Sequence, residues 1–522
     1  MPSLADLLFV PSRAPGDGAA RRAATRAALA LAGLGFCLST ICAFTLPVLL
    51  APDERAHLGY VEVLLEGDLP TVDRDIPVDG RFIVLRQYYP DGSASAGRYG
   101  DVWVANHPPL AYLVATPVAW AASAVGFDRG APMAMRLLSG LGMLVGVLAT
   151  VAVSDALLPA ERRTAAVAAG LVALTPALVS IGGYGYTDGF AFAVGTSLLA
   201  VLLRVARWGP TRPRFVALVA LGSAALLSRS ALLPLVPLAA VVWLARTWGQ
   251  GPARALVRSA IVVVVPVLAG GWFYLRNVDL YGSVTGSGYL QEKFRRSDSG
   301  TTLRLLARPR FLLGAWQDLW GSFSDFGDRV SVGSGRTVVG SPASRIGSRL
   351  LIGGGLAVLA VLGWAESWWR ERARRPRRAA WLSWGAATGW TVVGVVGMAS
   401  FVSGGGTPHA RYLLPALSVI ATVLAGGFAR LPRGPAVSGG VLIVLVGLDL
   451  VLVVRMTTFV QVGGFSPPLQ QPGSSAVIVL LAYVAAIAAG LVAAFALVAT
   501  NDQRLTGATE IDASGPSADH HS

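Results

Sequence analysis

The chain has 522 residues, of which 54% are hydrophobic and only 14% are charged, whereas about 25% of an ordinary soluble domain is charged. This composition excludes a soluble enzyme and a disordered scaffold. It also excludes a disulfide-built secreted domain, because the two cysteines, Cys37 and Cys42, lie in one apolar run. The net charge of +14 comes mostly from arginines clustered between apolar runs, which indicates membrane topology rather than nucleic-acid binding.

Apolar runs recur along the chain at lengths close to the roughly 20 residues that a membrane-spanning helix needs. They occupy 27–50, 134–158, 164–183, 188–206, 214–228, 231–247, 256–275, 347–366, 380–402, 411–429, 435–455 and 475–499. The run at 214–228 is short and Arg229 separates it from the next run, so the two are predicted to form a tight hairpin. The sequence therefore predicts an all-α polytopic membrane protein with about twelve transmembrane helices.

Arginines in the short connections predict the orientation of these helices. The clusters that fall in alternate connections include Arg162–Arg163, Arg204–Arg214 and Arg370–Arg378. This pattern places both termini in the cytoplasm of a multi-pass plasma-membrane protein, provided that 110–126 lies along the outer surface. Pro108 and Pro109 favour that surface helix, whereas a true span at 110–126 would require a parity change elsewhere.

The same pattern predicts the organisation of the chain. A cytoplasmic segment, 1–26, precedes a transmembrane core at 27–430, and further transmembrane helices at 431–499 precede a disordered cytoplasmic tail at 500–522. Two large external loops, 51–133 and 276–346, are the least apolar parts of the core and are expected to carry surface helices.

The first external loop opens with Asp53, Glu54 and His57. Adjacent carboxylates at a membrane surface are costly to desolvate, so they either stay hydrated or have a function. In a helix, Asp53 and His57 would share a face, and a carboxylate in a partly apolar cleft is a suitable general base for a hydroxyl. The alternative is that Asp53 only caps a surface helix and that Glu54 is solvated.

Two further residues of this kind lie at predicted outer boundaries. His107 precedes two prolines that start a helix well, and its imidazole would bond a phosphate or a sugar hydroxyl unless it is simply exposed or capping. Asp188 opens the fourth span, at a depth where an acid is expected to point into a cavity. It would also serve as the N-cap of that helix.

Cationic and polar side chains are predicted at the same boundary. They are Arg229, Arg276, His409, Arg411 and Tyr412. Any single one of them could extend to the lipid headgroups. Together with the acids they are typical of a site that handles a negatively charged group at this depth.

These motifs resemble those of the GT-C superfamily of membrane glycosyltransferases, which take a sugar from a polyprenyl-phosphate carrier. The pair Asp53-Glu54 resembles the acidic motif of the protein O-mannosyltransferases and aminoarabinose transferases. The string from His107 to Leu110 matches their His-Pro-Pro-Leu, and Asp188 stands in the place of their second acid. The sequence departs from the mannosyltransferases at Ala111, because a lysine often follows the prolines there.

A family of predicted bacterial polytopic proteins without an assigned reaction is similar as well. Its members show Pro-Asp-Glu-x-x-His early, Arg-Asn followed by Tyr-Gly midway, and Arg-Tyr-Leu-x-Pro-Ala late. Here these motifs are Pro52–His57, Arg276–Asn277 with Tyr281–Gly282, and Arg411–Ala416. The resemblance runs from about residue 27 to 430.

The resemblance implies transfer of a sugar, on the external face, from a polyprenyl-phosphate donor to a glycan, lipid or protein acceptor of the cell envelope. Asp53, with Glu54 as second candidate, would be the catalytic base. The departing lipid phosphate needs prearranged positive charge, with Arg229, Arg276, His409 and Arg411 as candidates. The remaining substrate-binding candidates are His57, His107, Asp188 and Tyr412.

Three alternatives stay open. A divalent metal would find hard oxygen ligands in Asp53, Glu54 and Asp188, although arginines can replace it, and we favour a site with neither metal nor other cofactor. A twelve-span transporter or flippase predicts repeated halves and acids at mid-membrane, which the sequence does not show. A non-catalytic partner in envelope assembly would keep these motifs without activity.

Overall fold

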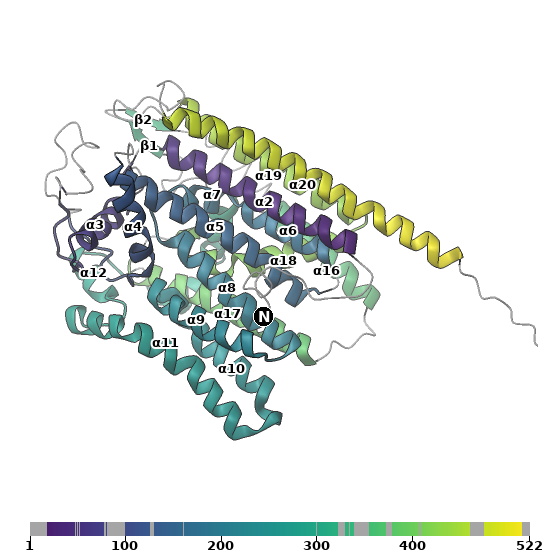
Figure 1. Ribbon diagram of the computed structural model, residues 1–522, viewed down its shortest axis with the longest axis horizontal. Coiled ribbons are helices and arrows are strands. Elements are labelled where there is room, and N and C mark those ends of the chain that lie inside the picture. The colour runs from purple at the N-terminus through teal and green to yellow at the C-terminus, as the bar shows by residue number, and fades with distance from the viewer. Residues whose placement is uncertain are drawn as a thin grey trace, which may run out of the picture.

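The computed structural model describes residues 18–46, 48–49, 51, 53–77, 80, 100–125, 130–159, 161–298, 300–321, 329–332, 335–338, 354–371, 378–406, 409–459 and 474–513. Long helices form an elongated bundle with most axes along one direction (Figure 1). The bundle helices are α2 (Gly18–Thr45), α5 (Gly130–Leu157), α6 (Arg162–Ala173), α7 (Pro176–Gly182), α8 (Asp188–Trp208), α9 (Arg212–Ser228), α10 (Leu235–Thr247), α11 (Pro252–Tyr281), α16 (Gly355–Glu371), α17 (Arg378–Ser403), α18 (Leu414–Arg430), α19 (Gly434–Phe459) and α20 (Ser474–Ala513).

Among the described residues, fewer helices than the twelve predicted are both long enough and apolar enough to span a membrane. In the described part of the chain, eight helical segments meet both conditions, and nine do if α6 and α7 form one broken span. The other predicted runs are also helical where the structure describes them, with 347–353 outside the described residues, but α9 has only 17 residues and the apolar parts of α16 and α19 are similarly short. The all-α polytopic fold is confirmed, while the number twelve stays a prediction.

The predicted span at 164–183 is not one straight helix. Its two halves, α6 and α7, meet at an angle of 60°. Pro176 starts α7, and Thr175 before it is extended, with φ −75° and ψ 113°. A residue before proline is sterically kept out of the helical region, so the chain turns here.

Short helices occupy the predicted external loops. They are α3 (Glu54–Leu65), α4 (Leu110–Ala124), α12 (Ser287–Lys293), α13 (Thr302–Leu306) and α14 (Pro309–Gly321). An antiparallel hairpin of β1 (Arg329–Val332) and β2 (Gly335–Val338) follows them, with Arg329 opposite Val338. The 15 residues of α4 span about 22 Å, less than the roughly 30 Å of a bilayer core; its position on the surface stays a prediction. Most of α3 is buried, so it is not an exposed surface helix.

The two external loops are fastened to each other. The Asn106 side chain donates to the Thr285 carbonyl at 2.8 Å, and the Asn277 side chain donates to the Asn106 carbonyl at 3.0 Å. The Tyr281 hydroxyl accepts from the Val72 N–H at 3.0 Å. Gly282 then ends α11 with φ +70°, a conformation that favours glycine. Asn277 of the Arg-Asn motif and Tyr281 of the Tyr-Gly motif therefore hold the two external loops together.

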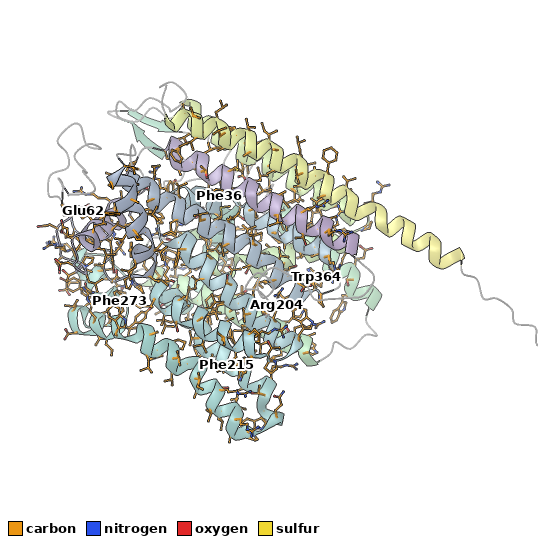
Figure 2. The ribbon with its side chains drawn as sticks, viewed as in Figure 1. Phe36, Glu62, Arg204, Phe215, Phe273 and Trp364 are labelled. Carbon is orange, nitrogen blue, oxygen red and sulfur yellow. The ribbon has the colours of Figure 1, made fainter. Side chains whose placement is uncertain are left out.

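The opposite end of the bundle holds the residues predicted on the other side. Arg430 pairs with Glu161 at 2.7 Å and lies 3.9 Å from the centre of the Trp364 ring. In Figure 2, Glu62 of α3 lies near one end of the bundle, and Trp364 and Arg204 lie toward the other. Which side of the membrane each end of the bundle faces stays a prediction.

The C-terminal segment differs from its prediction. Helix α20 continues to Ala513 and extends past the rest of the bundle (Figure 1), so 500–513 is helical rather than a disordered tail. Residues 500–513 contain no proline that would stop the helix. Residues 514–522 lie outside the described residues, as do 1–17 of the predicted N-terminal segment, which is helical from Gly18.

Candidate active site

Asp53 stands at the start of α3, where α2 has ended and the first external loop begins. It occupies the N-cap position, yet its side chain makes no capping hydrogen bond. Its Oδ2 lies 2.8 Å from Nη1 of Arg411, and the Asp53 side chain is 24% exposed. The partly exposed carboxylate is therefore held by an arginine rather than by a capping hydrogen bond, which differs from the capping alternative.

Arg411 lies in the short helix η5 (Ala410–Leu413) that leads into α18. Its backbone N–H donates to Nδ1 of His409 at 3.0 Å, and its Nη2 donates to the Tyr412 hydroxyl at 3.2 Å. The guanidinium also lies over two rings, 5.5 Å from the centre of Tyr186 and 5.3 Å from that of Tyr412. Aromatic faces attract a guanidinium, so several contacts besides Asp53 hold Arg411 in place.

A second ion pair joins Asp188 and Arg229. Asp188 Oδ2 and Arg229 Nη1 are 2.6 Å apart, with side chains 5% and 14% exposed. Thr187, not Asp188, is the N-cap residue of α8. The next residue, Gly189, lies so close to α5 that a Cβ there would meet the Ser139 carbonyl oxygen at 2.2 Å. Glycine lets the backbones approach and thereby sets the position of Asp188.

Histidine and tyrosine rings line the space beside the two ion pairs. Nδ1 of His57 and the Tyr112 hydroxyl share a hydrogen bond of 2.7 Å. The His57 ring centre lies 5.9 Å from that of His107 and 5.3 Å from that of Tyr186. Tyr60 stacks on Tyr112 with their centres 3.8 Å apart. His57 and His107, both predicted to bind substrate, are thus neighbours.

The electrostatics of the site follow from burial and from the two arginines. Burial lowers the pKa of His57 to about 4, although the Asp53 and Asp188 carboxylates oppose that shift. Burial, with the Arg229 charge, also lowers the pKa of His107 well below its usual range. Burial alone would raise the pKa of Asp53, but the Arg411 charge, together with the Arg411 hydrogen bond and the nearby imidazoles, offsets burial and lowers that pKa. At neutral pH His57 and His107 are therefore uncharged and Asp53 is ionised.

The lowered pKa of His57 predicts that the stability of the protein depends on pH. An unfolded histidine binds its proton near pH 6.5 and folded His57 near pH 4, so the unfolded chain binds more protons between these values. The free energy of unfolding should then fall as the pH decreases from 6.5 to 4. His57→Gln should reduce that slope, by up to one proton, in thermal unfolding of the protein in detergent. If His57→Gln shows the same slope as the wild type, the low pKa of His57 is wrong. His107 contributes to the slope in both proteins, so the difference between the two slopes reports on His57.

Glu54, the second candidate for the base, has a different role. Its carboxylate is fully buried and receives Nε and Nη2 of Arg136 at 2.7 and 2.8 Å. It also accepts the N–H groups of Leu49 and Gly185 at 2.7 and 2.9 Å. All its acceptor directions are occupied by the protein, so Glu54 holds the site together rather than meeting a substrate.

Arg136 completes this buried connection. Its Nη1 donates to the carbonyls of Ala43 and Leu46 at 2.6 and 2.7 Å. One ion pair therefore joins the end of α2, the start of α3, the start of α5 and the turn that carries Tyr186. It fixes the positions of Asp53 and of the Tyr186 ring, over which Arg411 lies.

The structure places Arg276 against the first external loop. Its Nη2 donates to the Pro70 carbonyl at 2.6 Å, and its guanidinium lies 5.8 Å from the centre of the Phe273 ring. Arg276 thus supports the first external loop, and we leave it out of the phosphate site. His409 caps the short helix η5, because its Nδ1 accepts the Arg411 N–H.

The three carboxylates considered as metal ligands do not converge. Asp53 faces Arg411, Glu54 faces Arg136, and Asp188 faces Arg229. Over the described ranges, no three His, Cys, Asp or Glu side chains form a group that could hold a metal ion. Because each carboxylate is paired with its own arginine, these three side chains do not fit a metal ion that they would share.

Sequence reasoning missed three residues of the site, namely Arg136, Tyr112 and Tyr186. Arg136 is a single charge at the start of a long apolar run, and such a charge is itself a signal. Tyr186 lies two residues before Asp188, in a string with two tyrosines. Their partners are far away in the sequence, so only the folded chain shows what they contact.

No family model matches the chain, and no curated protein matches it. Among solved structures, it is similar to ArnT from Cupriavidus metallidurans bound to undecaprenyl phosphate, at 19% identity and a TM-score of 0.47, over 91% of this chain and 73% of that one. It is also similar to the oligosaccharyltransferase AglB from Archaeoglobus fulgidus in complex with an inhibitory peptide and a dolichol-phosphate. There the identity is 12% and the TM-score 0.40, over 91% of this chain and 55% of that one.

The chain spans about half of the length of AglB. At these identities the likeness concerns the fold alone.

Proposed function

We propose that the protein transfers a sugar from a polyprenyl-phosphate carrier to a hydroxyl of a cell-envelope acceptor. One observation carries the proposal: the Asp53–Arg411 and Asp188–Arg229 ion pairs both lie close enough to the buried His57 ring to act on its charge. A base for the acceptor and positive charge for a phosphate are thus available within the same site.

The reaction is an inverting displacement. Asp53 removes the proton from the acceptor hydroxyl while the acceptor oxygen attacks the anomeric carbon. The bond between that carbon and the phosphate oxygen breaks, and its electron pair stays on the lipid phosphate. Asp53 ends as a carboxylic acid and the carrier as a phosphate monoester.

Arg229 and Arg411 stabilise the phosphate. A guanidinium matches phosphate oxygens in a bidentate geometry, and prearranged charge at the leaving group is a large catalytic contribution. The uncharged imidazoles of His57 and His107, with Asp188 and Tyr412, orient the sugar and the acceptor. The polyprenyl chain lies between helices in the membrane, on the external face, so a cytoplasmic nucleotide sugar is not required.

A transfer assay tests the proposal. Purified protein is incubated with labelled polyprenyl-phosphate sugars and envelope acceptors, and we expect label to move to the acceptor while free polyprenyl phosphate accumulates. A transporter would move solute across a vesicle membrane without consuming the carrier, and a non-catalytic partner would do neither. Either of those results would contradict the proposal.

The same assay tests the metal question. Each carboxylate of the site faces its own arginine, so the transfer rate should stay within about twofold in excess EDTA, a change below roughly 0.5 kcal/mol. A loss of activity that Mg²⁺ or Mn²⁺ restores would show that the carboxylates rearrange around a metal.

A further inference from the structure

One arginine of the site is bound to the group that acts as base. Arg411 Nη1 lies 2.8 Å from Asp53 Oδ2, while Arg229 lies 2.6 Å from Asp188, which receives no proton in the reaction. The two arginines therefore differ. The partner of Arg229 keeps its charge throughout, whereas the partner of Arg411 loses its charge when the acceptor proton arrives.

The charges of the reaction change in a matching way. The donor phosphate is a diester with one negative charge, and it leaves as a monoester that gains a second one. At the same time Asp53 changes from an anion to a neutral acid. The total charge is constant, but one negative charge moves from Asp53 to the phosphate.

We infer that Arg411 is a counter-ion shared by the two groups: it neutralises Asp53 before transfer and the leaving phosphate after it. This inference deepens the proposed function and rests on it. Protonation of Asp53 weakens its hold on Arg411 as the phosphate gains charge, so base and leaving group are coupled through one guanidinium. The lipid phosphate product binds most tightly when Asp53 is neutral.

The surroundings of Arg411 permit this exchange. The Tyr412 hydroxyl accepts from Nη2 at 3.2 Å, and the rings of Tyr186 and Tyr412 lie at 5.5 and 5.3 Å. These contacts do not depend on the charge of Asp53, so the guanidinium stays in the site when the carboxylate is neutralised. The Arg411 and Asp53 side chains are 16% and 24% exposed, which leaves the pair accessible to a ligand.

Binding of undecaprenyl monophosphate in nanodiscs tests the inference without any transfer step. Asp53→Asn imitates the protonated base and should bind this lipid about tenfold more tightly than the wild type, a change of about 1.4 kcal/mol. Glu161→Gln removes a carboxylate that pairs with Arg430 at the other end of the bundle and should leave the affinity unchanged. Equal affinity of Asp53→Asn and wild type would overturn the inference.

A double-mutant cycle separates sharing of Arg411 from general repulsion by Asp53. In an Arg411→Gln background, Asp53→Asn should change the affinity less than about twofold, while in Arg411→Lys the tightening should persist. Tightening of full size in Arg411→Gln would contradict a shared counter-ion. Thermal unfolding of each variant shows that it is folded.

The inference and the proposed function fail in different ways. If the wild type binds the lipid and transfers sugar but Asp53→Asn binds no more tightly, the shared role of Arg411 is wrong and the transferase stands. If the wild type neither binds polyprenyl phosphate nor transfers sugar, both are wrong.

Discussion

Asp53→Asn is expected to lower the rate of sugar transfer at saturating donor and acceptor by about 10²- to 10⁴-fold, the range that general base catalysis contributes. The Asp53 carboxylate is ionised because the Arg411 charge lowers its pKa. Asparagine keeps the size of the side chain but cannot accept the acceptor proton. The rate is measured in the transfer assay, with the thermal unfolding temperature as a check on folding.

A matched control comes from the same external loop. Asp73 contacts Lys293 and Tyr289 and its side chain is 55% exposed, so Asp73→Asn removes a similar carboxylate away from the site. Its transfer rate should stay within about twofold of the wild type, or roughly 0.4 kcal/mol. The assignment of Asp53 as base is wrong if Asp53→Asn keeps more than about a tenth of the wild-type rate.

Glu54→Gln is expected to have the largest effect on stability. Removing one partner of a buried ion pair leaves the other charge uncompensated, which costs about 3–5 kcal/mol in free energy of unfolding. Here both side chains of the Glu54–Arg136 pair are fully buried, and the carboxylate also accepts two backbone N–H groups. Denaturant unfolding of the protein in detergent measures this loss.

Glu161→Gln, at the other end of the bundle, is the comparison for Glu54→Gln. Glu161→Gln breaks the pair with Arg430, in which the side chains are 25% and 18% exposed, and more exposed pairs contribute about 0–1 kcal/mol. If both variants lose the same free energy of unfolding, burial does not make the Glu54–Arg136 pair more important for stability than the Glu161–Arg430 pair. If Glu54→Gln is stable but inactive, Glu54 acts in catalysis after all.

The membrane character of the chain, and the helix ends at which the charged residues of the site lie, follow from the amino-acid sequence alone. An apolar run of known length reverses the side of the chain each time it crosses, and arginine clusters orient those crossings. Asp53, Asp188, Arg229 and Arg411 could therefore be assigned to one boundary. Their residue types then indicated a site for an anionic group.

Which of these residues contact one another depends on how the helices pack and cannot be derived from their order along the chain. Helix length places a residue along the bundle axis, but the direction of its side chain around that axis depends on helix rotation and on the order of neighbours. The sequence could not show that Asp53 faces Arg411 while adjacent Glu54 faces Arg136. It also could not show that Arg276 supports a loop, because that role depends on a carbonyl contributed by a distant segment.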